Sequence, residues 1–271
     1  MIMSFDVKHI KDKNGYLVFF KIIENKYIDS LTSNGQIYFS LLSAYREMEK
    51  EGKTAIGDKT ECSLTHKVSK YIIYDGETYE IHGKTSGYNA RVENNQCAFC
   101  FYALEMKDYD RIAENKLRHV IPYTILEKIC KDKGGVSNCS ISIFDDQVIH
   151  KIYSALCKKQ IKYAGKHVEY DNFDYVPKHD INSVGYSIEA AFHKLENYSY
   201  QHEFRIVAIN HCHEPINDLY IDVEKNDFNV IKLRKNMDFY SEITYNVVQE
   251  KEKYASIEFT ASSFLKDISA K

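Results

Sequence analysis

The sequence predicts an α+β fold with mixed, mainly antiparallel strands and peripheral helices. Short apolar or alternating runs, bounded by Gly, Asn and Asp, recur along the chain and are typical of strands. Amphipathic helical patterns occur between them, but without the regular strand–helix alternation that predicts a parallel sheet. A chain of 271 residues can bury a substantial core, and its 11 Gly and 3 Pro argue against long disordered linkers.

The N-terminal elements are predicted from apolar spacing. The run YLVFFKII (16–23) is typical of a buried strand, and QIYFS (36–40) of a second, shorter one. Between them Tyr27, Ile28 and Leu31 have helical spacing, and Asn34-Gly35 is a C-terminal stop signal. The amphipathic segment 41–52 predicts a second helix, and the stretch after it is loop-like.

The remaining elements follow from the same rules. Alternating segments from about 62 to 104 predict antiparallel strands joined at turns such as Asp75-Gly76. Helical patterns cover 122–132 and 145–159, a strand follows in IKYAGKHVEY, and GYSIEAAFHKLENY predicts a short helix. The C-terminal third returns to strands in LYIDV, EITYNVV and YASIEF, before a last amphipathic stretch, TASSFLKDIS.

Composition narrows the class of protein. A formal net charge of −3 gives the whole chain no attraction to nucleic acid or anionic membrane, although it leaves room for a local basic patch. No apolar run approaches the roughly 20 residues that span a bilayer, and the N-terminus lacks the pattern of a signal peptide. Seven scattered Cys argue against a disulfide framework. We therefore expect a cytoplasmic protein that does not associate with membranes.

The segment YSYQHEFRIVAIN (198–210) has an unusual polar pattern. Read as one strand, it alternates between an aromatic face and a polar face, because successive strand side chains point to opposite sides. The polar face carries Ser199, Gln201, Glu203 and Arg205. Two interpretations are open: the face meets water, or it lines a cleft in which an acid does chemistry.

Four stretches carry a resemblance to a known family. They are NGQIYFS, YREME and GDKTE early in the chain and FHKLENYSYQHEFRI late in it. Together they resemble a broad bacterial family with the layout G-x-[IL]-Y-F-S, an acidic D-x-x-E loop and a K…Y…E-x-E-[FY]-R strand. That layout is similar to the ADP-ribosyltransferase fold. The resemblance implies a single domain over 1–271 with an ADP-ribosyltransferase-like core and an inserted middle region, at about 105–185.

The resemblance implies a role for seven residues. Glu203 matches the catalytic acid, and Gln201, two residues earlier, would contact the acceptor. Family members with Glu at the position of Gln201 suit arginine acceptors, whereas Gln occurs with others, including nucleobases and asparagine. Five residues would hold NAD: Lys21 at the diphosphate, Tyr38 or Tyr200 stacked on nicotinamide, Ser40 hydrogen-bonded to it, and Arg46 in the same early segment. Breaking the nicotinamide–ribose bond passes through an oxocarbenium-like state, which a nearby carboxylate stabilises.

Simpler interpretations stand beside these roles. Glu203 and Arg205 form a water-facing ion pair if the polar face is solvated, and Lys21 is then only a strand-end lysine. Cys97 and Cys100 with His211-Cys212-His213 could supply four zinc ligands, but residues three apart on a strand point to opposite faces, so we expect no metal. The chain has no GxGxxG, P-loop or G-x-S-x-G pattern.

The expected function is therefore an NAD-dependent ADP-ribosyltransferase that acts as a toxin or anti-phage defence effector. Its acceptor would be a macromolecule, with nucleic acid favoured by Gln201, and an antitoxin or inhibitor protein is the expected partner. The alternatives are a non-catalytic module that binds a nucleotide or a partner, and an NAD glycohydrolase.

Overall fold

The computed structural model describes most of the chain as two compact units. The described residues are 2–7, 16–52, 64–74, 77–87, 96–144, 146–171, 188–209, 219–223, 228–248 and 252–262. The first unit comprises 1–35, 101–150 and 223–271, and the second comprises 36–100 and 151–222. The single domain with an insertion at 105–185 stays a prediction.

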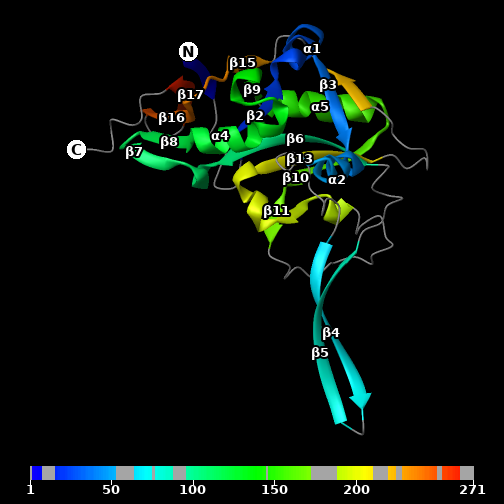
Figure 1. The fold of residues 1–271 in the computed structure, drawn as a ribbon. Helices are drawn as coiled ribbons and strands as arrows, with labels where there is room; N and C mark the ends of the chain where they lie inside the picture. The colour runs from blue at the N-terminus through cyan, green and yellow to red at the C-terminus, as the bar shows by residue number, and fades with distance from the viewer. Residues whose placement is uncertain are drawn as a thin grey trace. The chain divides into compact units, whose positions relative to one another are not determined.

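The fold class agrees with the sequence: the chain is mixed α+β, with mostly antiparallel strands and few helices. β11 (Glu169–Asp171) and β12 (His193–Leu195) run parallel, whereas pairs such as β10–β13, β16–β17 and β4–β5 run antiparallel. Figure 1 shows the elements in chain order. No helix within the described ranges is long and apolar enough to cross a membrane.

The first unit contains two groups of strands. One is a sheet in the order β1-β17-β16-β8-β7, and the other joins β2, β9, β15 and the second half of β6. The strands are β1 (Ile2–Val7), β2 (Tyr16–Glu24), β6 (Gln96–Glu105), β7 (Asp110–Ala113), β8 (Lys116–Ile121), β9 (Cys139–Phe144), β15 (Asn229–Lys232), β16 (Asp238–Val248) and β17 (Glu252–Ser262). The helices are η1 (Asn25–Tyr27), α1 (Ile28–Asn34), η2 (Met106–Asp108), α4 (Tyr123–Cys130), η3 (Lys131–Lys133), η4 (Val136–Asn138) and the start of α5 (Asp146–Lys158).

The core of the first unit forms where these strands and α4 bury their apolar side chains. Phe20 of β2 is fully buried and stacks on Tyr102 of β6, with ring centroids 4.6 Å apart. Leu126 and Cys130 present the apolar side of α4 to the same cluster. α1 ends where the sequence predicts, because Gly35 adopts the left-handed conformation (φ 65°) that an L side chain disfavours.

The second unit carries the late polar motif. Its strands are β3 (Gln36–Leu41), β4 (Leu64–Tyr74), β5 (Glu77–Gly87), the first half of β6, β10 (Lys162–His167), β11, β12, β13 (Glu203–Ile209) and β14 (Leu219–Asp222). Its helices are α2 (Leu42–Lys50), the rest of α5 and η5 (Glu196–Gln201). β13 lies between β10 and β6, and β3 pairs with both β6 and β14.

All seven residues of β13 are buried, as expected for a strand with a neighbour on each side. Its apolar end packs with Leu42 of α2, Ala98 of β6 and Phe192. β10 runs beside it, with Gly165 opposite Ile206. A Cβ atom on Gly165 would lie 2.2 Å from the Tyr153 hydroxyl of α5, so glycine allows this helix to approach the strand closely.

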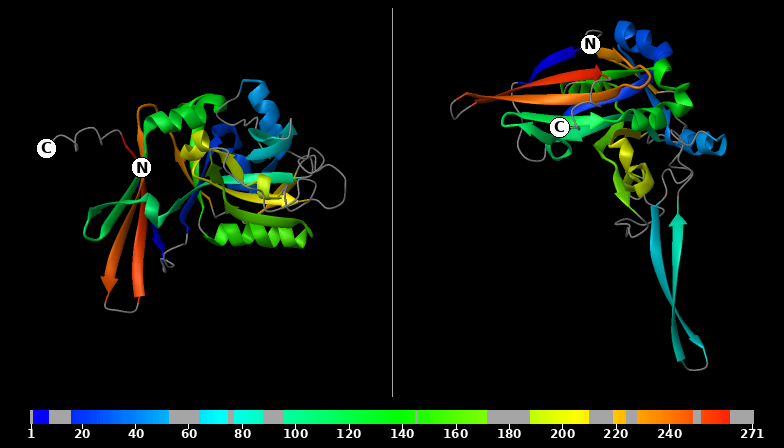
Figure 2. Two further views of the ribbon diagram at one scale, coloured as in Figure 1. Left: turned by 90° about the horizontal axis from the view of Figure 1, so that it is seen from below. Right: turned by 60° about the vertical axis from the view of Figure 1, so that its left-hand side comes forward.

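β4 and β5 form a long hairpin of two 11-residue strands, shown in cyan in Figure 2. They pair in continuous register from Leu64 opposite Gly87 to Tyr74 opposite Glu77. This confirms the antiparallel strands predicted from about 62 onwards, whereas the predicted turn at Asp75-Gly76 lies outside the described residues.

The prediction for 198–210 is wrong at its N-terminal end. Residues 196–201 form the 3₁₀ helix η5, and the strand begins only at Glu203. Between them His202 adopts a left-handed conformation (φ 41°, ψ 48°), which breaks the alternation of strand side chains. The short helix predicted for 185–198 is found only in part: residues 188–190 are helical, but β12 and η5 occupy its second half.

Candidate functional site

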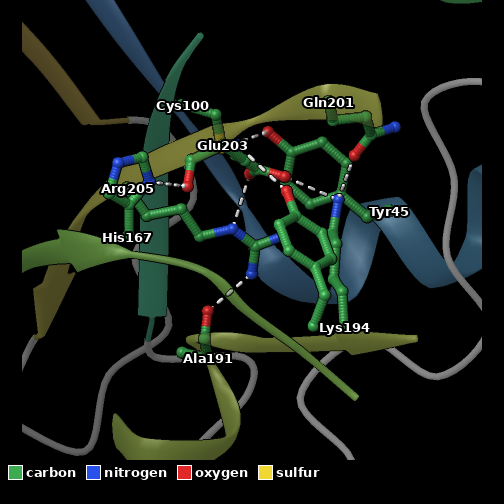
Figure 3. A network of polar contacts seen from close by, with 9 residues as sticks. Tyr45, Cys100, His167, Ala191, Lys194, Gln201, Glu203 and Arg205 are labelled. Carbon is green, nitrogen blue, oxygen red and sulfur yellow. Dashed lines mark hydrogen bonds and ion pairs between the residues drawn. The ribbon is translucent and has the colours of Figure 1, made fainter. Parts of the chain in front are cut away.

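Glu203 is the centre of a buried polar network. It is the first residue of β13, directly after the left-handed turn at His202, and is only 6% exposed. A strand this deeply buried needs a partner for any charge it carries, because an isolated buried carboxylate is strongly disfavoured. Figure 3 shows how the neighbouring side chains meet this need.

Two buried cations hold the Glu203 carboxylate. The Arg205 guanidinium donates from Nε to Oε1 at 2.6 Å, and the Lys194 ammonium donates from Nζ to Oε2 at 2.7 Å. Arg205 is 1% exposed and also donates from Nη1 to the Ala191 carbonyl at 2.6 Å. Both carboxylate oxygens therefore accept a charge-assisted hydrogen bond inside the protein.

Lys194 links Gln201 to Glu203. Lys194 lies on β12, is 7% exposed, and donates a second hydrogen bond to Gln201 Oε1 at 2.8 Å. Its ammonium also lies 5.5 Å from the centre of the Tyr198 ring. Gln201 thus reaches the site from η5 through a shared lysine, and not through the strand alternation that the sequence suggests.

The charges keep Glu203 ionised. Burial alone would raise the pKa of this carboxyl group, but Arg205 and Lys194 outweigh it, and a hydrogen bond from Cys100 acts in the same direction. The pKa of Glu203 therefore lies well below its ordinary value of 4.5. At neutral pH the site therefore presents an ionised carboxylate in surroundings from which water is largely excluded.

The backbone of Glu203 is fixed as firmly as its side chain. Its N–H donates to the Tyr170 hydroxyl at 2.9 Å, and its carbonyl accepts from the Val168 N–H at 2.8 Å. His167 Nδ1 lies 3.1 Å from the same carbonyl. Burial raises the pKa of Tyr170, and the nearby Glu203 charge adds to this effect. The residue that carries the candidate chemistry is therefore held in one position.

A second group of residues approaches Glu203 from β3, α2 and β6. The Tyr45 hydroxyl lies 3.8 Å from Cys100 Sγ, and Cys100 hydrogen-bonds to Glu203. Ser40 hydrogen-bonds to Tyr45, and burial raises the pKa of the Tyr45 hydroxyl well above its usual range. Ser40, predicted as a ligand of NAD, is thus connected to the carboxylate through Tyr45 and Cys100.

The other predicted residues lie in different surroundings. Tyr38, two residues before Ser40 on β3, is 42% exposed and lies beside Tyr220 of β14, with ring centroids 5.0 Å apart. Tyr200 is half-buried in η5. Lys21 lies on β2 of the first unit, opposite Ser142 in register. Arg46 lies in α2, but its side chain is outside the described part of the structure.

The burial of Glu203 and Arg205 decides one of the open interpretations. A water-facing ion pair is wrong, because both residues lie in the core. The alternation by itself pointed to the opposite result, since alternating polar residues on a strand are typical of a solvated face. The fully apolar run Val207-Ala208-Ile209 directly after them was the available signal, because it predicts a strand that is buried on both sides.

Lys194, Tyr170 and Cys100 belong to the network but were not identified as site residues from the sequence. Lys194 was visible as the lysine of the K…Y…E-x-E-[FY]-R layout, but a lysine before a turn is normally solvated. Tyr170 lies 33 positions before its partner Glu203, and no local pattern connects them. Cys100 was considered only as part of a CxxC pair; Cys97 is buried in β6 and Cys100 half-buried.

In the described ranges, no three His, Cys, Asp or Glu side chains gather closely enough to hold a metal ion, and His211–His213 lie outside those ranges. No protein-family model, curated protein or solved structure matches this chain.

Proposed function

We propose that this protein is an NAD-dependent ADP-ribosyltransferase that modifies a macromolecular acceptor, nucleic acid or protein, as a toxin or anti-phage effector. The observation that carries the proposal is the Glu203 carboxylate, held ionised in a buried site and joined to Gln201 by Lys194. Such an activity would need an antitoxin or inhibitor protein as its partner.

The chemistry of the site suits this reaction. Loss of nicotinamide from NAD develops positive charge on the ribose, as in the oxocarbenium-like state of glycoside hydrolysis. A carboxylate that is already ionised and fixed stabilises that charge without reorganising. Glu203 has these properties, because its side chain and its backbone are both hydrogen-bonded.

The resemblance to the ADP-ribosyltransferase layout adds support. The late motif spreads Lys194, Gln201, Glu203 and Arg205 over 12 positions, and all four meet in one network. An ADP-ribosyltransferase-like core is part of the proposal. Ser40, Tyr38 and Tyr200 belong to the same unit and are the candidate ligands of the nicotinamide end, while Lys21 is the proposed contact to the diphosphate.

A non-catalytic module of the same fold is the second candidate, and one observation favours it. Both oxygens of Glu203 already accept hydrogen bonds from cations, and the residue is 6% exposed. A ribose hydroxyl could reach the carboxylate only after Lys194 or Arg205 gave way. If neither does, the network is structural, and the protein would bind a nucleotide or a partner without turnover.

One experiment separates these functions. The protein is incubated with labelled NAD and with cellular RNA, DNA and protein fractions, and both label transfer and nicotinamide release are measured. We expect transfer by the wild type and a loss on the order of 100-fold in Glu203→Gln, the usual cost of removing an electrostatic contribution to a transition state.

Glu242→Gln is the matched control, since Glu242 is also a buried glutamate bonded to a lysine and an arginine but lies in the first unit. It should retain transfer. Nicotinamide release without label transfer would identify an NAD glycohydrolase. Binding of NAD without turnover would support the non-catalytic module. Equal label transfer by the wild type and by Glu203→Gln would overturn the catalytic role of Glu203.

A further inference from the structure

Two buried thiols meet in the first unit. Cys130 is the last residue of α4 and Cys139 is the first residue of β9, and both are free and fully buried. They belong to the same apolar cluster, and their side chains hydrogen-bond to each other. A disulfide requires its two cysteines to be close neighbours with Cα atoms within about 7 Å, because otherwise the backbone must move. Two thiols that already touch in the folded chain are therefore candidates for a disulfide.

A tight turn brings the two thiols together. The segment 131–138 joins α4 to β9 through η3 and η4, which both contact α4. The chain reverses at Gly134 and Gly135, whose φ angles of 80° and 89° suit glycine and strain other residues. The Gly135 N–H donates to the Cys130 carbonyl at 3.0 Å, which ties the turn to the end of α4. The turn itself therefore places Cys139 next to Cys130.

The surroundings make one of the two thiols easier to ionise. The Cys130 S–H stabilises a thiolate on Cys139, and the Lys133 ammonium adds to this effect, so the pKa of Cys139 is lowered although burial and the Glu24 charge oppose it. The pKa of Cys130 is raised, because Cys139 holds its proton and burial disfavours a second charge. The thiolate is the form of cysteine that reacts with oxidants. Cys139 is therefore the thiol that reacts first, and Cys130 is the one that follows.

The segment between the thiols lies at the surface of the protein. Within 131–138 Val136 is buried, whereas the other residues are exposed or half-buried. Cys139 Sγ lies 4.0 Å from the Lys133 carbonyl of this segment. A small oxidant can therefore reach Cys139 through a local opening of the turn, without unfolding of the sheet that contains β9.

We propose that Cys130 and Cys139 are a redox-active dithiol, which a hydroperoxide converts to a disulfide that stabilises the first unit. This inference is independent of the proposed transferase function. A disulfide between the end of α4 and the start of β9 would restrict the unfolded chain, which is the main way in which such bonds stabilise proteins.

The reaction has two steps. The Cys139 thiolate attacks a peroxide oxygen, so that the O–O bond breaks and an S–O bond forms; the hydroxide that leaves becomes water by taking up the proton that Cys139 had released. The Cys130 sulfur then attacks the Cys139 sulfur, an S–S bond replaces the S–O bond, and a second water leaves with the Cys130 proton. The two sulfur atoms together lose two electrons, and the peroxide gains them.

The first test detects the bond directly. The folded full-length chain is treated with hydrogen peroxide, blocked with N-ethylmaleimide in denaturant, digested with trypsin and analysed by mass spectrometry. Trypsin cleaves after Lys131 and Lys133, so Cys130 and Cys139 fall on different peptides, and a disulfide appears as a joined pair. We expect the joined pair after oxidation and its loss after dithiothreitol. Cys157→Ala, which removes the exposed cysteine of α5, is the matched control and should retain the joined pair.

The second test assigns the order of attack. In Cys130→Ala no second thiol is available, so dimedone, which reacts with sulfenic acids, should label Cys139. In Cys139→Ala dimedone should leave Cys130 unlabelled. If an alanine variant does not fold, the wild type still decides: dimedone present during oxidation should be found on Cys139 and should lower the yield of the joined pair.

The third test measures the effect on stability. The urea midpoint of the wild type should rise after peroxide treatment and return to its starting value in dithiothreitol, while that of Cys130→Ala should not rise. Oxidation of Cys157 without a joined Cys130–Cys139 pair, or a joined pair that forms only in urea, would overturn the dithiol. A disulfide between Cys97 and Cys100 in its place would do the same. A lower midpoint of the oxidised wild type would overturn the stabilising role of the bond.

Discussion

Glu203 and Glu242 are two buried glutamates with similar partners and different surroundings. Each forms ion pairs with one lysine and one arginine: Glu203 with Lys194 and Arg205, Glu242 with Lys116 and Arg118. Both carboxylates are 6% exposed, and both have a lowered pKa. The two regions can therefore be compared with the burial of the glutamate and the types of its ion-pair partners nearly the same.

The difference lies in the cations. The side chains of Lys194 and Arg205 are 5% and 1% exposed, whereas those of Lys116 and Arg118 are 32% and 23% exposed. Arg118 lies opposite Glu242 across the β8–β16 ladder, an arrangement that sheets commonly use at a surface. Water solvates the partners of Glu242, but the partners of Glu203 depend on the protein for their hydrogen bonds.

This difference indicates what each cluster costs and what it can do. Moving a cluster of charges out of water can cost more desolvation free energy than the ion pairs gain by attraction. Such clusters are therefore weak evidence for a purely stabilising role. The Glu242 cluster has the features of a cross-strand ion pair whose cations are partly solvated. The Glu203 cluster has the features expected of a functional site, where a charge is kept in low-dielectric surroundings for use.

The largest expected effect is on stability when an arginine is removed. Arg205→Met leaves Glu203 with Lys194 alone and leaves the Ala191 carbonyl without its donor. We expect the free energy of unfolding to fall by about 3–5 kcal/mol, the cost of breaking a buried pair. Arg118→Met should cost less than about 1 kcal/mol, because its pair is partly solvated. Urea denaturation at pH 7 measures both, and equal losses would remove the distinction between the clusters.

The second expected effect is on the pH dependence of stability. A carboxyl group whose pKa is lowered by folding stabilises the protein above its unfolded pKa, near 4.5, and this contribution is lost as the pH falls towards the folded pKa. Wild-type protein should therefore lose stability below about pH 4.5. The free energy of unfolding should depend less on pH in Glu203→Gln than in the wild type. The corresponding change should be smaller in Glu242→Gln, because water reaches the cations around Glu242. Urea titrations from pH 7 to pH 3 test this, and parallel curves for wild type and Glu203→Gln would contradict it.

The comparison also shows how far the sequence could predict the site. Apolar spacing predicted most strands, because strands such as β2, β3 and β13 contain runs of apolar residues that can be recognised without knowledge of the fold. It placed Gln201 on the wrong element, because η5 and the left-handed His202 depend on contacts with β11 and β12 and not on local propensity. Lys194 was missed as a site residue for a related reason. Its burial depends on two partners that come later in the chain, and no single-residue preference indicates that a lysine will be buried.

The smallest expected effect concerns the hydroxyl groups next to each glutamate. Tyr170 accepts a hydrogen bond from the Glu203 backbone N–H, and Tyr109 bonds to the buried hydroxyl of Ser241, next to Glu242, at 2.8 Å. Tyr170→Phe leaves a strand N–H that cannot turn to another acceptor, so we expect a loss of about 1–2 kcal/mol. Tyr109→Phe should cost about 1 kcal/mol or less, because the Ser241 hydroxyl can rotate to a new partner. Urea denaturation of the two variants at pH 7 measures the difference. No loss in Tyr170→Phe would mean that this hydrogen bond does not hold the backbone of Glu203, and the site would then lack part of the fixed geometry on which the proposed chemistry depends.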